Sequence, residues 1–164
     1  MSAPTRRSMS RLKRVGRYLK HRPRLIWTFG WQAGTDTIDV STDANWCGCK
    51  LTRKSTSGGT ICKGQHLIKA WSKTQSILAK SSAESELYGV VKGACEGLGV
   101  STLLKDFGET SPTIRMHVDA IAAKGIIERR GLNKLRHIGM DIRWLQEQEA
   151  RQLLPNKLRT TSRT

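Results

Sequence analysis

Hydrophobic and polar residues alternate along two segments of the chain, 38–43 (Ile-Asp-Val-Ser-Thr-Asp) and 114–119 (Ile-Arg-Met-His-Val-Asp). A two-residue period is that of a β-strand with one face buried and the other in contact with solvent. Each segment ends in an aspartate on its polar side, Asp43 in the first and Asp119 in the second. The pattern therefore predicts two half-buried strands with a carboxylate at the exit of each.

A hairpin and a long helix separate these two strands along the chain. Residues 60–62 and 67–71 are apolar runs joined through Gly64, and such a pair predicts two antiparallel strands. From 82 to 107, apolar residues recur at three- and four-residue spacing, which predicts a long helix with one face on the core. Its interior glycines are expected to be weak points where the helix bends or breaks: Gly93, Gly97 and Gly99.

The remaining segments complete a mixed α/β pattern. Helical spacing predicts a short helix over 120–129 and a last helix over 137–150. The element order β-β-β-α-β-α-α favours a mixed sheet with helices packed on it. A right-handed crossover after the long helix would pair the second alternating strand parallel with the first. We therefore expect Asp43 and Asp119 at the same edge of the sheet, where the sites of such folds gather.

The N-terminal part differs from the rest of the chain in composition. Residues 10–19 have the spacing of a short basic helix, which Pro23 would end. Residues 25–29 are an apolar run that resembles a strand. We predict a basic segment over 1–34 and a folded domain over 35–164.

Charge and cysteine usage restrict the class of protein. The net charge is +16, and no acidic residue precedes Asp36, which favours an anionic partner and nucleic acid first. Basic ends that are only solvated would give the same composition. No apolar run is long enough to span a membrane. The four cysteines fit no zinc spacing and are expected to be free intracellular thiols: Cys47, Cys49, Cys62 and Cys95.

Two glutamates at the start of the long helix extend the set of candidate carboxylates. Ser81 and Glu84 fit an N-terminal capping box, and Glu86 follows two residues later. The helix start alone explains either glutamate, because a helix N-terminus favours negative charge. A glutamate near Asp43 and Asp119 would instead form a cluster whose members repel one another and nucleic acid. Mg²⁺ relieves that repulsion, and paired ions catalyse phosphodiester hydrolysis, so the cluster predicts a metal-dependent nuclease site.

Six blocks of residues carry a resemblance to a known family. They are 40–46 (Val-Ser-Thr-Asp-Ala-Asn-Trp), 53–58 (Arg-Lys-Ser-Thr-Ser-Gly), 71–75 (Trp-Ser-Lys-Thr-Gln), 81–88 (Ser-Ser-Ala-Glu-Ser-Glu-Leu-Tyr), 117–119 (His-Val-Asp) and 136–138 (Arg-His-Ile). In this order they resemble the ribonuclease H domain of copia-type retrotransposon polyproteins, over roughly residues 35–149. Several spaced blocks are a more specific signal than one short motif. Residues 17–20 also resemble the end of the reverse-transcriptase region that precedes this domain, so the chain resembles a piece of a larger polyprotein.

The resemblance implies a ribonuclease H fold, a five-stranded mixed α/β sheet flanked by helices. It implies Mg²⁺- or Mn²⁺-dependent hydrolysis of the RNA strand in an RNA–DNA hybrid. It also implies that Asp43, Glu86 and Asp119 bind the metal ions, with Glu86 rather than Glu84 as the family's glutamate; Asp39 is not expected to be a ligand. The family implies an intracellular setting, in cytoplasmic particles or the nucleus, away from membranes.

The chain departs from the family pattern towards its C-terminus. The family's fourth carboxylate lies beyond a fifth strand and has no counterpart before Thr164, so we expect a truncated domain. An acid that the family often carries after His137-Ile138 is replaced by Gly139, and Asp141 is the alternative ligand. A second hypothesis is therefore a truncated or domesticated fragment that binds nucleic acid without cutting it.

Other residues have secondary assignments. His117 is expected to be a surface histidine, and His137 to have a structural or phosphate-facing role. Core packing is favoured over base stacking for three tryptophans: Trp46, Trp71 and Trp144. Five basic residues are expected to contact the nucleic-acid backbone without reading its sequence: Lys54, Lys73, Arg129, Arg130 and Lys134.

Overall fold

The computed structural model describes residues 5–24, 26–110, 112–118, 125 and 139–150. Its helices and strands follow in the order α1 (Arg6–His21), β1 (Thr37–Asn45), β2 (Thr56–Lys63), β3 (His66–Thr74), α2 (Ser82–Asp106), β4 (Thr113–Val118) and α4 (Gly139–Ala150). The chain divides into two compact units, Met1–Trp31 and Gln32–Thr164.

The first unit consists of the basic helix α1 and the segment that follows it. The helix begins earlier than the predicted 10–19 segment, because the Thr5 hydroxyl accepts a hydrogen bond from Ser8 N at 3.1 Å and caps the first turn. None of its side chains is buried. Residues 26–29 are not part of any strand, so the strand predicted over 25–29 is wrong in its described part. An apolar run of this kind becomes a strand only where cross-strand neighbours receive its side chains.

The second unit contains a four-stranded sheet in the order β3-β2-β1-β4, counted over the described residues. β1 pairs antiparallel with β2, and β2 with β3. β1 pairs parallel with β4, from Thr37 opposite Thr113 to Thr42 opposite Val118. The predicted hairpin, parallel crossover and mixed α/β class are therefore confirmed.

Gln32 fixes the start of this unit to the β2–β3 hairpin. Its side-chain amide donates to Lys63 O at 2.9 Å, and its carbonyl oxygen accepts from Gln65 N at 2.8 Å. The turn between them depends on Gly64, whose φ of +61° is rarely adopted by residues with a side chain. These contacts explain why the second unit begins at Gln32 rather than at the predicted residue 35.

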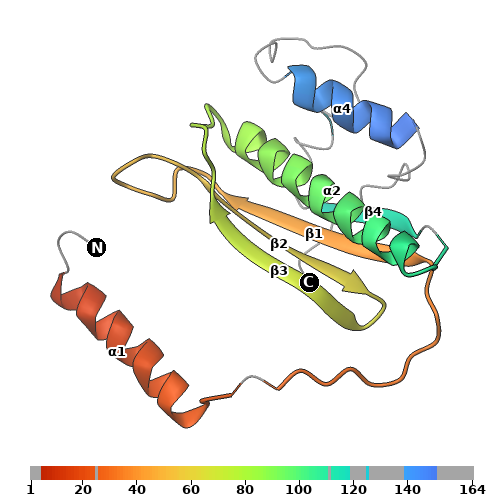
Figure 1. The fold of residues 1–164 in the computed structure, drawn as a ribbon. Coiled ribbons are helices and arrows are strands. Elements are labelled where there is room, and N and C mark those ends of the chain that lie inside the picture. The colour runs from red at the N-terminus through yellow and green to blue at the C-terminus, as the bar shows by residue number, and fades with distance from the viewer. Residues whose placement is uncertain (1–4, 25, 111, 119–124, 126–138, 151–164) are drawn as a thin grey trace. The chain divides into compact units, whose positions relative to one another are not determined.

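Helix α2 lies across one face of the sheet and covers the core (Figure 1). The alternation along β1 directs Ile38, Val40 and Thr42 to this face, where all three are buried. The core cluster of buried apolar residues is Ile38, Val40, Ile61, Leu87, Val90, Ala94, Ile114, Met116, Val118, Ile142 and Leu145.

Glycines let α2 approach the sheet closely. The helix is continuous from Ser82 to Asp106, so the predicted weak points Gly93, Gly97 and Gly99 do not break it. A Cβ atom added at Gly93 would overlap Thr42 Cγ2, and one at Gly97 would lie 3.0 Å from Val40 Cγ2. Local propensity disfavours glycine in a helix by about 1 kcal/mol, but here the tertiary contact requires it.

Helix α4 packs beside α2, and its Ile142 and Leu145 complete the core (Figure 1). It begins at Gly139, within the predicted 137–150 helix. The helix predicted over 120–129 lies outside the described residues apart from Gly125. Among the helices that the structure describes, none is both long enough and apolar enough to cross a membrane.

Candidate carboxylate site

Asp43 lies towards the carboxyl end of β1, on the face that α2 does not cover. Thr42 before it is buried against α2, and because side chains alternate along a strand, Asp43 projects to the other side and is exposed. It pairs with Gly58 of β2, which has no side chain to cover the carboxylate. The predicted position of Asp43, on the polar side near the strand exit, agrees with this geometry.

Glu86 is held beside this end of β1 by the first turns of α2. Glu86 is buried, with 7% of its surface exposed. Gly89 follows three residues later, on the same side of the helix. A Cβ atom at Gly89 would lie 3.9 Å from the backbone oxygen of Asp43 and 3.7 Å from Ser57 Oγ. The turn after Glu86 therefore contacts β1 at Asp43 itself.

Glu84 has a different role, in the start of the helix. It is 2% exposed, and its carboxylate accepts hydrogen bonds from Lys80 N at 2.9 Å and from the Tyr88 hydroxyl at 3.3 Å. Its own backbone N–H donates to Ser81 Oγ at 3.1 Å. Burial, together with the Glu84 carboxylate, raises the pKa of Tyr88 to about 12. These contacts are those of a capping acid, as the Ser81–Glu84 spacing predicts.

Asp119 lies outside the described residues, and so do His137 and three of the predicted phosphate contacts, Arg129, Arg130 and Lys134. The last described residue of β4 is Val118, which pairs with Thr42. In the sequence, Asp119 follows Val118 as Asp43 follows Thr42. The described part of the chain thus brings Asp43 and Glu86 to the same end of β1. Within it, no group of three or more His, Cys, Asp or Glu side chains could hold a metal ion.

Asp39 takes part in a separate network on the open face of the sheet. Its Oδ1 accepts from His117 Nε2 at 2.7 Å and from Arg115 Nη1 at 3.3 Å, both on the neighbouring strand β4. His117, which the sequence predicts to be a surface histidine, is therefore half-buried, with 18% of its side chain exposed, and it is paired with Asp39. The parallel register, with Asp39 opposite Arg115, is what brings these groups together.

Asp141, the alternative fourth ligand, lies in the first turn of α4. Its charge adds to the effect of burial in raising the pKa values of Tyr88 and Cys95. These two residues project about 180–200° around α2 from Glu86. The charge of Asp141 thus reaches Tyr88 and Cys95 on α2.

The predicted phosphate contacts that are described lie in different places. Lys54 is half-buried, just before β2. Lys73 is exposed on β3 and lines a cavity of about 380 Å³ between the end of β3 and α2. Trp71 and Trp144 pack against the core, as predicted, whereas Trp46 is 46% exposed and donates to Ala79 O at 3.1 Å.

No family model matches the sequence. The chain is 28% identical over 151 residues to "Retrovirus-related Pol polyprotein from transposon RE1" of Arabidopsis thaliana, and 28% identical over 150 residues to the corresponding RE2 polyprotein. The chain resembles part of a retrotransposon Pol polyprotein. The matches cover 90% of the chain but only 10% of each polyprotein, so the chain spans about one-tenth of the length of these curated relatives. The likeness to retrotransposon polyproteins predicted from the sequence blocks is thereby confirmed. A solved structure of a prototype foamy virus protease-reverse transcriptase aligns with a TM-score of 0.48 and 8% identity, over 83% of this chain and 19% of that one.

Proposed function

We propose that the chain is a ribonuclease H domain of a Pol polyprotein, which hydrolyses the RNA strand of an RNA–DNA hybrid with divalent metal ions. The observation that carries the proposal is the contact between α2 and the end of β1, which puts Glu86 one turn from the backbone of Asp43. Asp119, the next residue after β4, is the proposed third carboxylate. The Pol polyproteins that the chain resembles support the assignment.

The donor set fits Mg²⁺ or Mn²⁺. Both are hard cations that take oxygen ligands, usually one or a few carboxylates together with water and substrate phosphate oxygens. Asp43 and Glu86 supply carboxylate oxygens from two different elements, β1 and α2. When bound, paired ions activate the attacking water and stabilise the leaving oxygen. The net charge of +16 attracts the phosphate backbone without sequence preference.

Cleavage of a labelled RNA–DNA hybrid with Mg²⁺ or Mn²⁺ tests the proposal, with double-stranded DNA as control substrate. Asp43→Asn and Glu86→Gln should each lower the rate by about 100-fold or more, because each removes a ligand of ions that stabilise the transition state by several kcal/mol. Asp36→Asn is a matched control, since it makes the same change at an exposed aspartate just before β1. Glu84→Gln distinguishes the roles of the two glutamates. It should destabilise the start of α2 and leave the cleavage rate largely unchanged.

A second candidate is a fragment that binds nucleic acid without cutting it. Among the described residues, no group of three or more His, Cys, Asp or Glu side chains could hold a metal ion, and this favours the second candidate. Salt-sensitive hybrid binding with no metal-dependent cleavage would support this candidate. Equal cleavage by wild type, Asp43→Asn and Glu86→Gln would refute the proposed metal site.

A further inference from the structure

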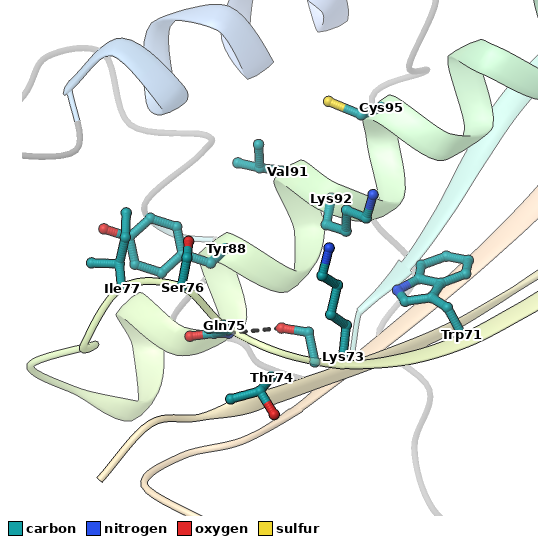
Figure 2. A pocket seen from close by; sticks show the side chains of 11 residues that line it. Trp71, Lys73, Thr74, Gln75, Ser76, Ile77, Tyr88, Val91, Lys92 and Cys95 are labelled. Carbon is teal, nitrogen blue, oxygen red and sulfur yellow. Dashed lines mark hydrogen bonds between the residues drawn. The ribbon is translucent and has the colours of Figure 1, made fainter. Parts of the chain in front are cut away.

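A groove of about 380 Å³ lies between the end of β3 and α2. Figure 2 shows Trp71 and Lys73 on one side of it, with Tyr88 and Lys92 of α2 on the other. The Tyr88 and Cys95 side chains that border it project about 180–200° around the helix from Glu86. These two lining residues therefore lie on a different side of α2 from Glu86, and a volume of this size suits a small ligand or one unit of a polymer.

The electrostatics of the groove favour an anion. Lys92 Nζ lies 2.6 Å from Glu96 Oε1, and Lys69 pairs with the other oxygen of the same carboxylate. Hydrogen bonds from both lysines hold the pKa of Glu96 below its usual value, so one carboxylate is shared between two cations. Lys73, which lines the groove, has no ion pair within the part of the chain that the structure describes. The ammonium groups of Lys73 and Lys92 lie between Trp71 and the Tyr88 ring in Figure 2.

Two buried polar atoms in the wall of the groove are unsatisfied. Trp71 Nε1 is a donor and Gln75 Oε1 is an acceptor, and neither has a hydrogen-bond partner among the described residues. Gln75 itself is held firmly, because its side-chain nitrogen donates to Ser57 Oγ at 2.7 Å and to Ser85 O at 2.8 Å. A buried polar atom without a partner costs about 1–3 kcal/mol, which a ligand that supplies the partner would recover.

Tyr88 contributes an aromatic surface. Its hydroxyl donates to Glu84, on the side away from Lys73, so its ring borders the groove (Figure 2). Burial and the carboxylates of Glu84 and Asp141 raise the pKa of Tyr88, whereas Glu96 is the carboxylate that pairs with Lys92. The groove thus has a cationic end formed by Lys73 and Lys92 and an aromatic end formed by Tyr88.

We propose that this groove binds single-stranded nucleic acid, with phosphate groups at Lys73 and Lys92 and a base against the Tyr88 ring. Sites for single-stranded nucleic acid combine two features: cationic side chains along the phosphate backbone, and aromatic rings that stack on the bases. The site needs neither metal nor cleavage. A second strand is not required at the groove, so it suits a strand freed from its complement near the carboxylate site.

Protection of Cys95 from alkylation tests the proposal on the full chain. Cys95 is exposed and lines the groove, whereas Cys49 lies in the loop between β1 and β2 and serves as an internal control. A thymidine octanucleotide at ten times its dissociation constant should slow alkylation of Cys95 about tenfold, because the free fraction falls by that factor. The rate at Cys49 should stay unchanged. No protection of Cys95 at saturating oligonucleotide would overturn the proposal.

Matched lysine variants test the cationic end of the groove, both in the Asp43→Asn background so that cleavage plays no part. Lys73→Ala should weaken protection about fivefold and lower the salt dependence by about 0.7 in slope, the value for one phosphate contact with a single strand. Lys105→Ala removes the same charge at an exposed site outside the groove and should change protection less than about twofold. Equal effects of the two variants would overturn the phosphate assignment.

An abasic octamer of the same charge tests the aromatic end. It should protect Cys95 about tenfold less well than the thymidine octamer, as expected for loss of a stacked base. Tyr88→Phe keeps the ring and should retain the preference for the thymidine octamer. Equal protection by the two oligomers, or by hexaglutamate, would show a general anion site and overturn the proposal. Hybrid cleavage is measured separately in the wild type. Failure of the groove proposal therefore leaves the ribonuclease proposal intact, and failure of the ribonuclease proposal leaves the groove proposal intact.

Discussion

Gly93→Ala is the substitution that tests most directly how closely α2 lies against β1. The added methyl group would overlap Thr42 Cγ2 and lie 3.2 Å from Met116 Cε and 3.3 Å from Val40 Cγ1. Thr42 is β-branched and sits in a central strand, so its side chain has little freedom to rotate away. The helix and the strand would have to separate to make room.

The expected magnitude follows from two opposing effects. Alanine is favoured over glycine inside a helix by about 1 kcal/mol. Overpacking of a core contact costs about 1–3 kcal/mol, and overlap with a methyl group that cannot move places this case in the upper part of that range. Gly99→Ala gains the same helix propensity, because a Cβ atom there meets nothing within 4 Å. The two variants should therefore differ by about 2–3 kcal/mol in the free energy of unfolding.

Urea denaturation of both variants, with thermal melting alongside, measures this difference. Gly99→Ala should melt above the wild type and Gly93→Ala below it, about 4–12 °C apart for a chain of this size. Thr42→Ser removes the overlapping methyl group, so the Gly93→Ala, Thr42→Ser double variant should be more stable than the sum of the single effects by about 1–2 kcal/mol. Equal stability of Gly93→Ala and Gly99→Ala would show that the helix does not approach β1 as described.

Three further predictions concern local chemistry. Ser81→Ala removes the acceptor for Glu84 N and should cost about 1 kcal/mol in urea denaturation, while Ser81→Asp, which keeps an acceptor, should not. Because the pKa of Tyr88 rises from 10.0 to about 12 on folding, the unfolded chain loses its phenolic proton first, and stability should fall as pH rises between these values. The melting temperature of Tyr88→Phe should fall less steeply with pH over this range than that of the wild type. An equal pH dependence in the two proteins would contradict the assignment. Hydrogen bonds from Thr52 lower the pKa of Cys49 while burial raises that of Cys95, so iodoacetamide near neutral pH should modify Cys49 first, and the reverse order would refute this.

The elements that could be predicted from the sequence are those with a clear period. The alternation over 38–43 and the three- and four-residue spacing of α2 each reflect one buried face, which a sequence records directly. Strands β2 and β3 are longer than the predicted runs, because pairing from Thr56 opposite Thr74 onwards extends them through polar and glycine residues. The need for glycine at position 93 cannot be predicted for the same reason, because it comes from Thr42, a neighbour that lies far away in the chain.

The candidate site could be predicted only in part. The strand pattern placed Asp43, but the spacing of Glu84 and Glu86 did not choose between them, and only the family resemblance favoured Glu86. The structure adds that Glu84 is engaged by Lys80 and Tyr88 at the helix start. The groove had no signal in the sequence, because Lys73 and its partners on α2 are residues of ordinary types that meet only through the β2–β3 pairing and the position of α2.

The contact between Gly93 and Thr42 also limits how the sequence can diverge among related copies. A larger residue at position 93 would overlap the Thr42 side chain, so a larger residue there should be tolerated only together with a smaller one at position 42. Thr42 directly precedes Asp43, so a compensating change falls next to a candidate metal ligand. Positions 42 and 93 should therefore covary among related copies that keep this fold.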